Sequence, residues 1–151
     1  MIKIIKATDK ELKEVEAIRI EMLKVVNHLP EDAVFDEAFM RNTNDYFSKA
    51  DQTTVLAVCE GEVIGCATIC YIYLMPTFDH PGGRRAHIMN VYTRKEYRRQ
   101  GIAIQMMHML IEEAKQRGVT ELSLDATEDG KPLYEKCGFS ASEESMVLNL
   151  K

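Results

Sequence analysis

The chain has 151 residues, of which 46% are hydrophobic and 28% are charged, and its formal net charge is −5 with an isoelectric point near 5.4. This length and composition predict one globular domain, residues 1–151, that buries about two-thirds of the surface of the unfolded chain. The acidic balance argues against a nucleic-acid partner, and no apolar run approaches the ~20 residues of a membrane span, so we expect a cytoplasmic protein.

The first half of the chain predicts a strand, two helices and a β-hairpin. Residues Ile2–Lys6 alternate as a short strand, and Thr8 with Glu11 predicts a helix start. The helix that follows presents one apolar face made of Leu12, Val15, Ile18, Met22 and Val25. A second, looser helix is expected from Phe35 to about Ala50. The hairpin consists of Thr54–Cys59 and Val63–Leu74, with the glycine of Glu60-Gly61-Glu62 in its turn.

The second half predicts a βαβ unit, a short helix and a last strand. A loop from Met75 to Arg85 leads into the strand Ala86–Thr93, and the helix Ile102–Arg117 connects it to the parallel strand Glu121–Ala126. Pro132 suits the first turn of a short helix that ends at Gly138, and a strand is expected near Ser145–Leu150. The order β-α-α-β-β-β-α-β-α-β predicts an α/β fold, a mixed central sheet with helices on both faces.

The loop between the predicted strand and the long helix has the character of an anion-binding site. It reads Arg98-Arg99-Gln100-Gly101-Ile102-Ala103. The start of a helix offers unpaired N–H groups and the positive end of the helix dipole, and Gly101 lets an oxygen approach the main chain. The alternative is a solvated basic corner with a turn at Gly101. From the loop alone, both interpretations stand about equal.

Other phosphate loops do not fit this sequence. A Walker-type loop needs Gly-Lys followed by Ser or Thr, whereas this chain has Gly101-Ile102-Ala103, and a dinucleotide fingerprint needs more than one glycine. The remaining interpretation is a loop suited to a diphosphate. The nearby residues Arg94, Lys95, Arg98 and Arg99 are too local for a duplex and fit a small polyanion better.

The four cysteines are expected to be free thiols. Cys59, Cys66, Cys70 and Cys137 show no Cys-x-x-Cys pair, and no histidine pair completes a zinc site. We therefore expect no metal. Cys66 and Cys70 are predicted to lie on one face of a strand as small core residues.

Three segments in a fixed order resemble the Gcn5-related N-acetyltransferase (GNAT) superfamily. They are Asn90-Val91-Tyr92-Thr93, Arg98-Arg99-Gln100-Gly101-Ile102-Ala103 and Leu133-Tyr134-Glu135-Lys136-Cys137-Gly138-Phe139. The second matches the Arg/Gln-x-x-Gly-x-Gly/Ala pattern of that family, and the third its Tyr-Glu-Lys-x-Gly-Phe signature. The resemblance is close over the second half of the chain, and the first half has a compatible order of elements.

The resemblance implies acetyl-CoA as cosubstrate and acetyl transfer to an amine. The diphosphate of coenzyme A would bind the main-chain N–H groups of the loop, with added contacts from Arg98 or Arg99. Its pantetheine arm would follow the strand edge, and a backbone N–H near Val91 would polarise the thioester carbonyl. The residues implied in cofactor binding are Val91, Tyr92, Thr93, Arg98, Arg99, Gln100, Gly101, Ile102 and Ala103.

Tyr134 is the general acid that the resemblance implies, since its hydroxyl would protonate the departing thiolate. The general base stays open among Glu37, Asp79, His80, His87 and a chain of water molecules. Many relatives carry an asparagine after the strand that precedes the last helix. This chain has Ala126-Thr127-Glu128-Asp129 there, so a cofactor contact from that asparagine is not expected.

The acceptor is expected to be the primary amine of a small molecule, an amino acid or a peptide. Two alternatives stay open, namely a sensor that binds acyl-CoA without turnover and a transferase that uses a longer acyl donor. Self-association into a homodimer stays open as well.

Overall fold

A computed structural model describes residues 1–151, and its centre is one five-stranded sheet with the order β1-β2-β3-β4-β5. The strands are β1 (Ile2–Lys6), β2 (Gln52–Cys59), β3 (Glu62–Tyr73), β4 (Arg84–Thr93) and β5 (Glu121–Leu124). The first four pair antiparallel with their neighbours, whereas β5 runs parallel to β4. The predicted hairpin and the predicted βαβ unit are both confirmed.

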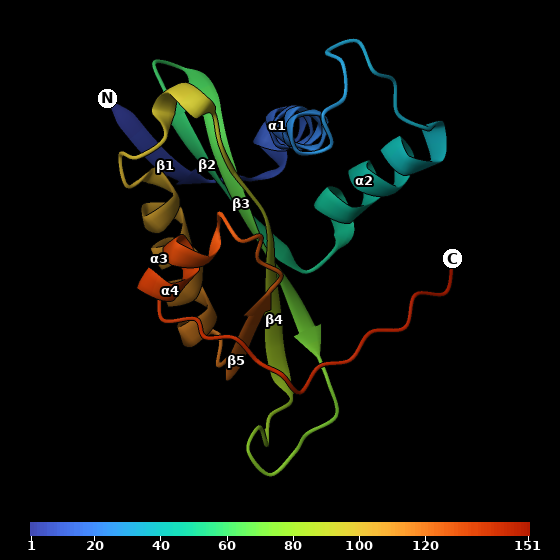
Figure 1. The fold of residues 1–151 in the computed structure, drawn as a ribbon, viewed down its shortest axis with the longest axis vertical. Coiled ribbons are helices and arrows are strands. Elements are labelled where there is room, and N and C mark those ends of the chain that lie inside the picture. Colours follow the sequence, from blue (N-terminus) through green and yellow to red (C-terminus); the bar gives the residue numbers. More distant parts are fainter.

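Helices cover both faces of the sheet, as the sequence predicts (Figure 1). On one face lie α1 (Leu12–Val26) and α2 (Glu37–Lys49), and on the other lies α3 (Ile102–Gln116). The short helix α4 (Lys131–Lys136) follows β5. Two single 3-10 turns, η1 (Asp9–Glu11) and η2 (Lys95–Tyr97), precede α1 and α3. No helix combines the length and the apolar character that a membrane span requires.

The start of the first helical region is fixed by a capping box. The Thr8 side chain accepts a hydrogen bond from the backbone N–H of Lys10, and the Glu11 side chain accepts one from the backbone N–H of Thr8. These bonds satisfy N–H groups that a helix start leaves unpaired. The predicted apolar face is buried at Val15, Ile18 and Met22, whereas Val25 is 47% exposed because α1 extends past the edge of its contact with the sheet.

Two apolar clusters form the core, one on each face of the sheet. Between the sheet and α3, the side chains of Met106, Met107 and Leu110 are fully buried against β2, β3 and β4. Between the sheet and α1, Ile18 packs with Leu56. Each such side chain contributes about 1.5–3 kcal/mol when it is fully buried. The sheet is therefore a rigid platform whose β4 end carries the features described below.

The predicted last strand is wrong. Residues 145–150 form no strand, and Met146, Val147, Leu148 and Leu150 are 95%, 92%, 82% and 89% exposed. The last part of the chain runs outward to the C-terminus, away from the sheet (Figure 1), so these residues pair with no strand. A short apolar segment is stable as a strand only where a partner supplies the ladder of hydrogen bonds.

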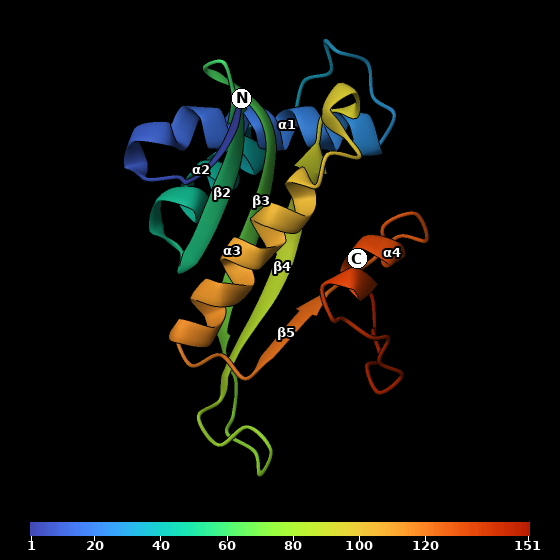
Figure 2. The same ribbon diagram turned by 90° about the vertical axis from the view of Figure 1, so that its left-hand side faces the viewer.

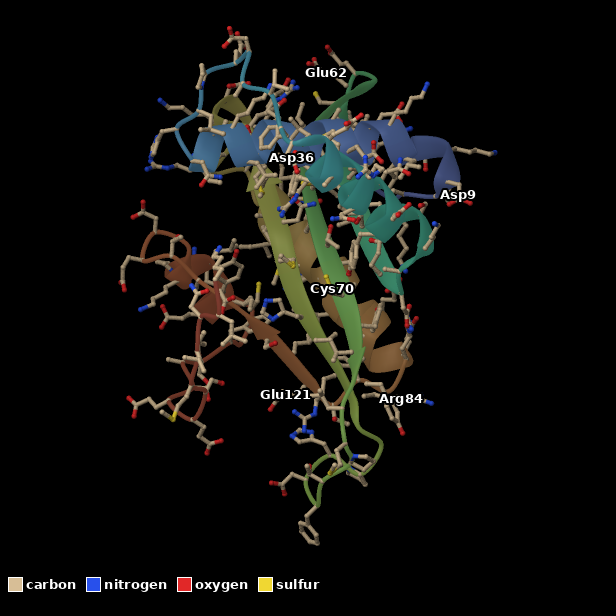
Figure 3. All side chains as sticks on the ribbon, turned by 90° about the vertical axis from the view of Figure 1, so that its right-hand side faces the viewer. Asp9, Asp36, Glu62, Cys70, Arg84 and Glu121 are labelled. Carbon is tan, nitrogen blue, oxygen red and sulfur yellow. The ribbon has the colours of Figure 1, made fainter.

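The cysteines match their prediction in part. All four thiols are free, as predicted. Cys66 is fully buried beneath α1, and burial raises the pKa of its thiol to about 12. Cys70 lies on the same face of β3, but it is only half-buried, because α1 and α2 leave the lower part of this face open (Figure 3).

Candidate functional site

The strands β4 and β5 separate partway along the sheet. Their pairing runs from Arg85 opposite Glu121 to Ile88 opposite Leu124, where β5 ends. β4 continues to Thr93, and β5 points away from it toward α4 (Figure 2). The edge of β4 from Met89 to Thr93 therefore has no strand beside it. Backbone groups along such an edge are available to a ligand.

A β-bulge interrupts β4 at the same level. Thr68 of β3 lies opposite Met89 and Cys66 lies opposite Tyr92, so Ala67 faces the pair Asn90–Val91. Asn90 adopts a left-handed conformation with φ of 62°, which asparagine tolerates better than most residues. A bulge changes the direction of backbone groups in the strand that contains it. It lies beside the gap between β4 and β5.

The Asn90 side chain is held by its neighbours. Its amide donates a 3.1 Å hydrogen bond to the Thr68 hydroxyl, and its amide oxygen accepts one of 3.2 Å from the Arg19 guanidinium. Its backbone carbonyl accepts a bond from the Cys66 thiol. Asn90 is 7% exposed, so these bonds are made in a largely dry environment that fixes the bulge.

The loop before α3 presents a row of unpaired donors. Arg99 and Gly101 have φ of 65° and 77°, and this path turns the chain into the first turn of the helix. No backbone N–H from Arg99 to Ile104 donates a hydrogen bond within the chain. A Cβ added at Gly101 would meet nothing within 4 Å, so the space above the main chain is open. These N–H groups and the helix dipole fit a diphosphate.

The predicted basic residues around this loop have different partners. Arg98 is exposed, but its Nε donates a 2.9 Å hydrogen bond to the carbonyl oxygen of Thr93, so it ties the loop to the end of β4. Arg94 forms ion pairs with Glu21 at 2.8 Å and Glu62 at 2.6 Å. The expectation that Arg94 serves a small polyanion is therefore wrong, because two carboxylates already neutralise it. Arg99 and Gln100 are exposed and form no side-chain hydrogen bond.

The three predicted residues of β4 differ in what they can offer a ligand. Val91 packs against the cluster beneath α3, whereas Tyr92 is buried beneath α1 and donates a hydrogen bond from its hydroxyl to Glu21. Thr93 is 9% exposed, and its hydroxyl oxygen has no partner. Only main-chain groups of Tyr92 and Thr93 can therefore face the gap. Ile102, which is 3% exposed, likewise offers only its backbone N–H.

Tyr134 lies on α4, on the α3 side of the sheet, and packs with the same apolar cluster as Val91. Its ring contacts Phe139 edge to face, with 6.2 Å between the ring centroids. Burial raises the pKa of its phenol, and the hydroxyl makes no hydrogen bond within the chain. A phenol that stays protonated and has no internal partner can donate a proton to a bound group.

Ahead of α4, Thr127 accepts a hydrogen bond from the Gly130 N–H.

Arg19 is the residue of this region that sequence reasoning missed. It projects from α1 toward the bulge, and it is half-buried without an ion-pair partner, whereas Arg85, Arg94 and Arg117 each pair with a carboxylate. Burial lowers the pKa of its guanidinium. One signal was present, because Arg19 lies four residues after Val15 and so on the buried stripe of the helix.

Comparisons with known proteins show which proteins this chain resembles. A family profile described as "Acetyltransferase (GNAT) family" matches residues 16–139. The glucosamine 6-phosphate N-acetyltransferase of Trypanosoma brucei brucei is 28% identical over 145 residues, which cover 94% of this chain and 97% of that protein.

Solved structures share the fold over the whole length. A predicted acetyltransferase from Clostridium acetobutylicum, determined with acetyl-CoA, is 30% identical, with a TM-score of 0.85 over 99% of this chain and 96% of that one. The glucosamine-6-phosphate N-acetyltransferase of Arabidopsis thaliana is 22% identical with a TM-score of 0.70, over 100% of this chain and 99% of that one, which supports the fold alone.

Proposed function

Because this chain belongs to the acetyltransferase (GNAT) family, we propose that it transfers an acetyl group from acetyl-CoA to the primary amine of a small molecule, an amino acid or a peptide. The observation that carries the proposal is the row of unpaired N–H groups from Arg99 to Ile104 beside the free edge of β4. When bound, acetyl-CoA supplies an acetyl group activated as a thioester.

The proposed binding site combines the loop and the strand edge. Backbone N–H groups from Arg99 to Ile104 bind the diphosphate, because they are unpaired, converge at a helix start and have open space above Gly101. The edge from Met89 to Thr93 hydrogen-bonds the amide groups of the pantetheine arm. Arg98 holds these two parts together through its bond to Thr93, so its main role in this proposal is to position the loop.

The proposed chemistry uses the bulge and Tyr134. A backbone N–H at Val91, directed by the bulge, polarises the thioester carbonyl as negative charge develops on its oxygen. Tyr134 donates its phenolic proton to the departing sulfur. Its raised pKa agrees with this role, since the phenol remains protonated at neutral pH and has no internal hydrogen bond to break.

An amino sugar phosphate is the first acceptor to test. Relatives over most of the chain bear the name glucosamine 6-phosphate N-acetyltransferase. Independently, the unpaired guanidinium of Arg19 near the bulge favours an acceptor that carries an anionic group, because a partly desolvated cation gains from an anion that water no longer screens.

An assay of thiol release from acetyl-CoA across a panel of amines tests the proposal. The panel contains glucosamine 6-phosphate, glucosamine, free amino acids and a short peptide, and the variant Tyr134→Phe is measured beside the parent. We expect turnover with at least one amine and a loss of turnover in the variant with unchanged acetyl-CoA binding. If the parent binds acetyl-CoA without turnover, a sensor of acyl-CoA is favoured. If turnover occurs only with a longer acyl-CoA, a transferase that uses a longer acyl donor is favoured.

A further inference from the structure

His87 lies on the sheet face that is opposite α3. Its neighbours Ala86 and Ile88 point into the cluster beneath α3, so the alternation of a strand directs His87 to the other side. Its cross-strand partners are Cys70 on β3 and Ser123 on β5. The imidazole therefore stands on the open part of the face that α1 and α2 otherwise cover, where Figure 3 labels Cys70.

The His87 ring has a defined orientation. Its Nδ1 lies 2.8 Å from the Ser123 hydroxyl, and its Nε2 lies 3.8 Å from Oδ2 of Asp125. A neutral ring that donates from Nδ1 to Ser123 has its lone pair at Nε2. The Asp125 carboxylate is exposed and lies on the Nε2 side of the ring.

His87 also stands at the entrance to the gap between β4 and β5. The pairing of these strands ends one residue later, at Ile88 opposite Leu124, and Asp125 directly follows the end of β5. Tyr134 packs on the α3 side, next to Val91. His87 and Tyr134 thus lie on opposite faces of the sheet at this gap. This arrangement suits an amine that approaches from one face and a sulfur that departs toward the other.

The other titratable groups considered from sequence lie elsewhere. Glu37 is exposed in the first turn of α2, and Asp79 is exposed in the loop between β3 and β4. His80 repeats the arrangement of His87 at the far end of the sheet, with Nδ1 2.8 Å from the Thr120 hydroxyl and Nε2 3.6 Å from Glu121. It lies beyond the start of β4, away from the gap.

We infer that His87 is the general base of the acetyl transfer. This inference rests on the proposed function and assigns a residue to a step that the function requires. The amine nitrogen forms a bond to the acetyl carbon, the bond from that carbon to sulfur breaks, and the product is an amide and a free thiol. Nε2 of His87 takes up the proton that the nitrogen loses, and the sulfur receives one from Tyr134. Both side chains then exchange protons with water.

Few charged groups lie near His87. Asp125 faces it from the end of β5, and Cys70 faces it from β3. Arg85 lies on the same face of β4, but Glu121 pairs with it at 2.8 Å. The inference therefore predicts that loss of His87 changes the acidic limb of the pH profile of kcat/KM, because an imidazole must be neutral to accept a proton.

The experiment compares His87→Gln with His80→Gln, which removes an equivalent histidine with the same kinds of partners. Initial rates of thiol release are measured for an amine that the wild-type protein acetylates, from pH 5.5 to 9.5. We expect His87→Gln to lower kcat by about 100- to 1000-fold and to abolish the acidic limb. Its dissociation constant for acetyl-CoA and its melting temperature should match those of His80→Gln, which should keep the wild-type profile.

Two results would overturn the inference, and they are distinguishable. If the wild-type protein turns over and His87→Gln keeps its rate and its acidic limb, the role of His87 is wrong while the proposed function stands. If the wild-type protein releases no thiol with any amine, the proposed function fails and the role of His87 fails with it. A His87→Gln variant that binds acetyl-CoA normally excludes misfolding as the cause of a low rate.

Discussion

The guanidinium of Arg19 on α1 donates a 3.2 Å hydrogen bond to the side-chain oxygen of Asn90 at the bulge of β4. This bond joins α1 to the bulge of β4, which lies beside the gap between β4 and β5. It also leaves most of the guanidinium donors of Arg19 without a partner in the chain. Arg19 thus has a structural role toward Asn90 and free donors for an anionic ligand.

Substitution of Arg19 is expected to affect anionic acceptors selectively. Charge-assisted hydrogen bonds contribute about 1.5–3 kcal/mol, so Arg19→Met should raise the KM of an acceptor phosphate by roughly 10- to 100-fold. The KM of the same amine without the phosphate should change little. Lys13→Met, which removes an exposed charge from the same helix, is the control. Equal effects of Arg19→Met on both acceptors would exclude anion recognition by this residue.

The conformation of Asn90 can be tested separately from its side-chain bonds. Asn90→Gly keeps a residue that tolerates φ of 62° but loses the bonds to Arg19 and Thr68, so we expect a loss of about 1–3 kcal/mol in the free energy of unfolding. Asn90→Val adds the strain of a β-branched residue at positive φ. It should also lower kcat by roughly 100-fold, because the backbone N–H near Val91 moves.

Chemical denaturation and steady-state kinetics of the two Asn90 variants provide the measurement. If both variants keep the wild-type kcat, the bulge has no role in the reaction.

Tyr134→Phe should separate binding from chemistry. The substitution removes the hydroxyl but keeps the ring that packs on Phe139, so the melting temperature should stay near that of the parent. Loss of a general acid lowers kcat by about 100-fold or more, while the KM of acetyl-CoA should be unchanged.

The pH dependence of the parent follows from the raised pKa of Tyr134. A raised value keeps the phenol protonated to higher pH, so the basic limb of kcat should lie above the ordinary phenol value of about 10. Tyr73→Phe, at an exposed position at the end of β3, is the control for loss of a phenol. If the basic limb of kcat persists in Tyr134→Phe, that limb belongs to another group.

The Glu21–Arg94 pair should make stability depend on acid pH. The bond from Arg94 lowers the pKa of Glu21, so the folded state holds the carboxylate more strongly than the unfolded state does. This contribution is present above the unfolded value of about 4.3 and is lost as the pH falls through the lower folded value. At pH 7, Glu21→Gln should cost about 1 kcal/mol of unfolding free energy.

Urea denaturation of Glu21→Gln and of the parent, at pH 7 and at pH 3, measures the contribution of this pair to the free energy of unfolding. The difference between the two proteins should shrink at pH 3. If the two proteins differ in free energy of unfolding by the same amount at both pH values, the Glu21 carboxylate is not the group responsible.

Most of the elements could be predicted from local sequence patterns, because the residues that specify each element lie close together in the sequence. The capping box at Thr8, the turn at Gly61 and the spacing of Met106 and Leu110 specify a helix start, a hairpin and a buried face from nearby residues alone. The loop ending at Gly101 belongs to the same class, since a helix start leaves its own N–H groups unpaired.

The errors concern features that depend on distant parts of the chain. Residues 145–150 are mostly apolar, as in a strand, but they pair with no other strand. Arg94 belongs to a basic cluster in the sequence, yet Glu21 from α1 neutralises it in the fold. The partners of Arg19 and His87 come from other elements of the fold, so the neighbours of these residues in the sequence do not specify their contacts.

The most direct test of the diphosphate site is a calorimetric titration of acetyl-CoA into the wild-type protein, Gly101→Glu and Gly61→Glu. Both glycines have φ near +80°, with values of 77° and 80°, and a Cβ at either would meet nothing within 4 Å, so the two substitutions impose similar backbone strain.

Only Gly101 lies among the unpaired N–H groups, where a carboxylate would repel phosphate. We predict binding by the wild-type protein and by Gly61→Glu with equal affinity, and an affinity at least about 10-fold lower for Gly101→Glu. Absence of binding by the wild-type protein, or equal affinities for all three proteins, would contradict the account.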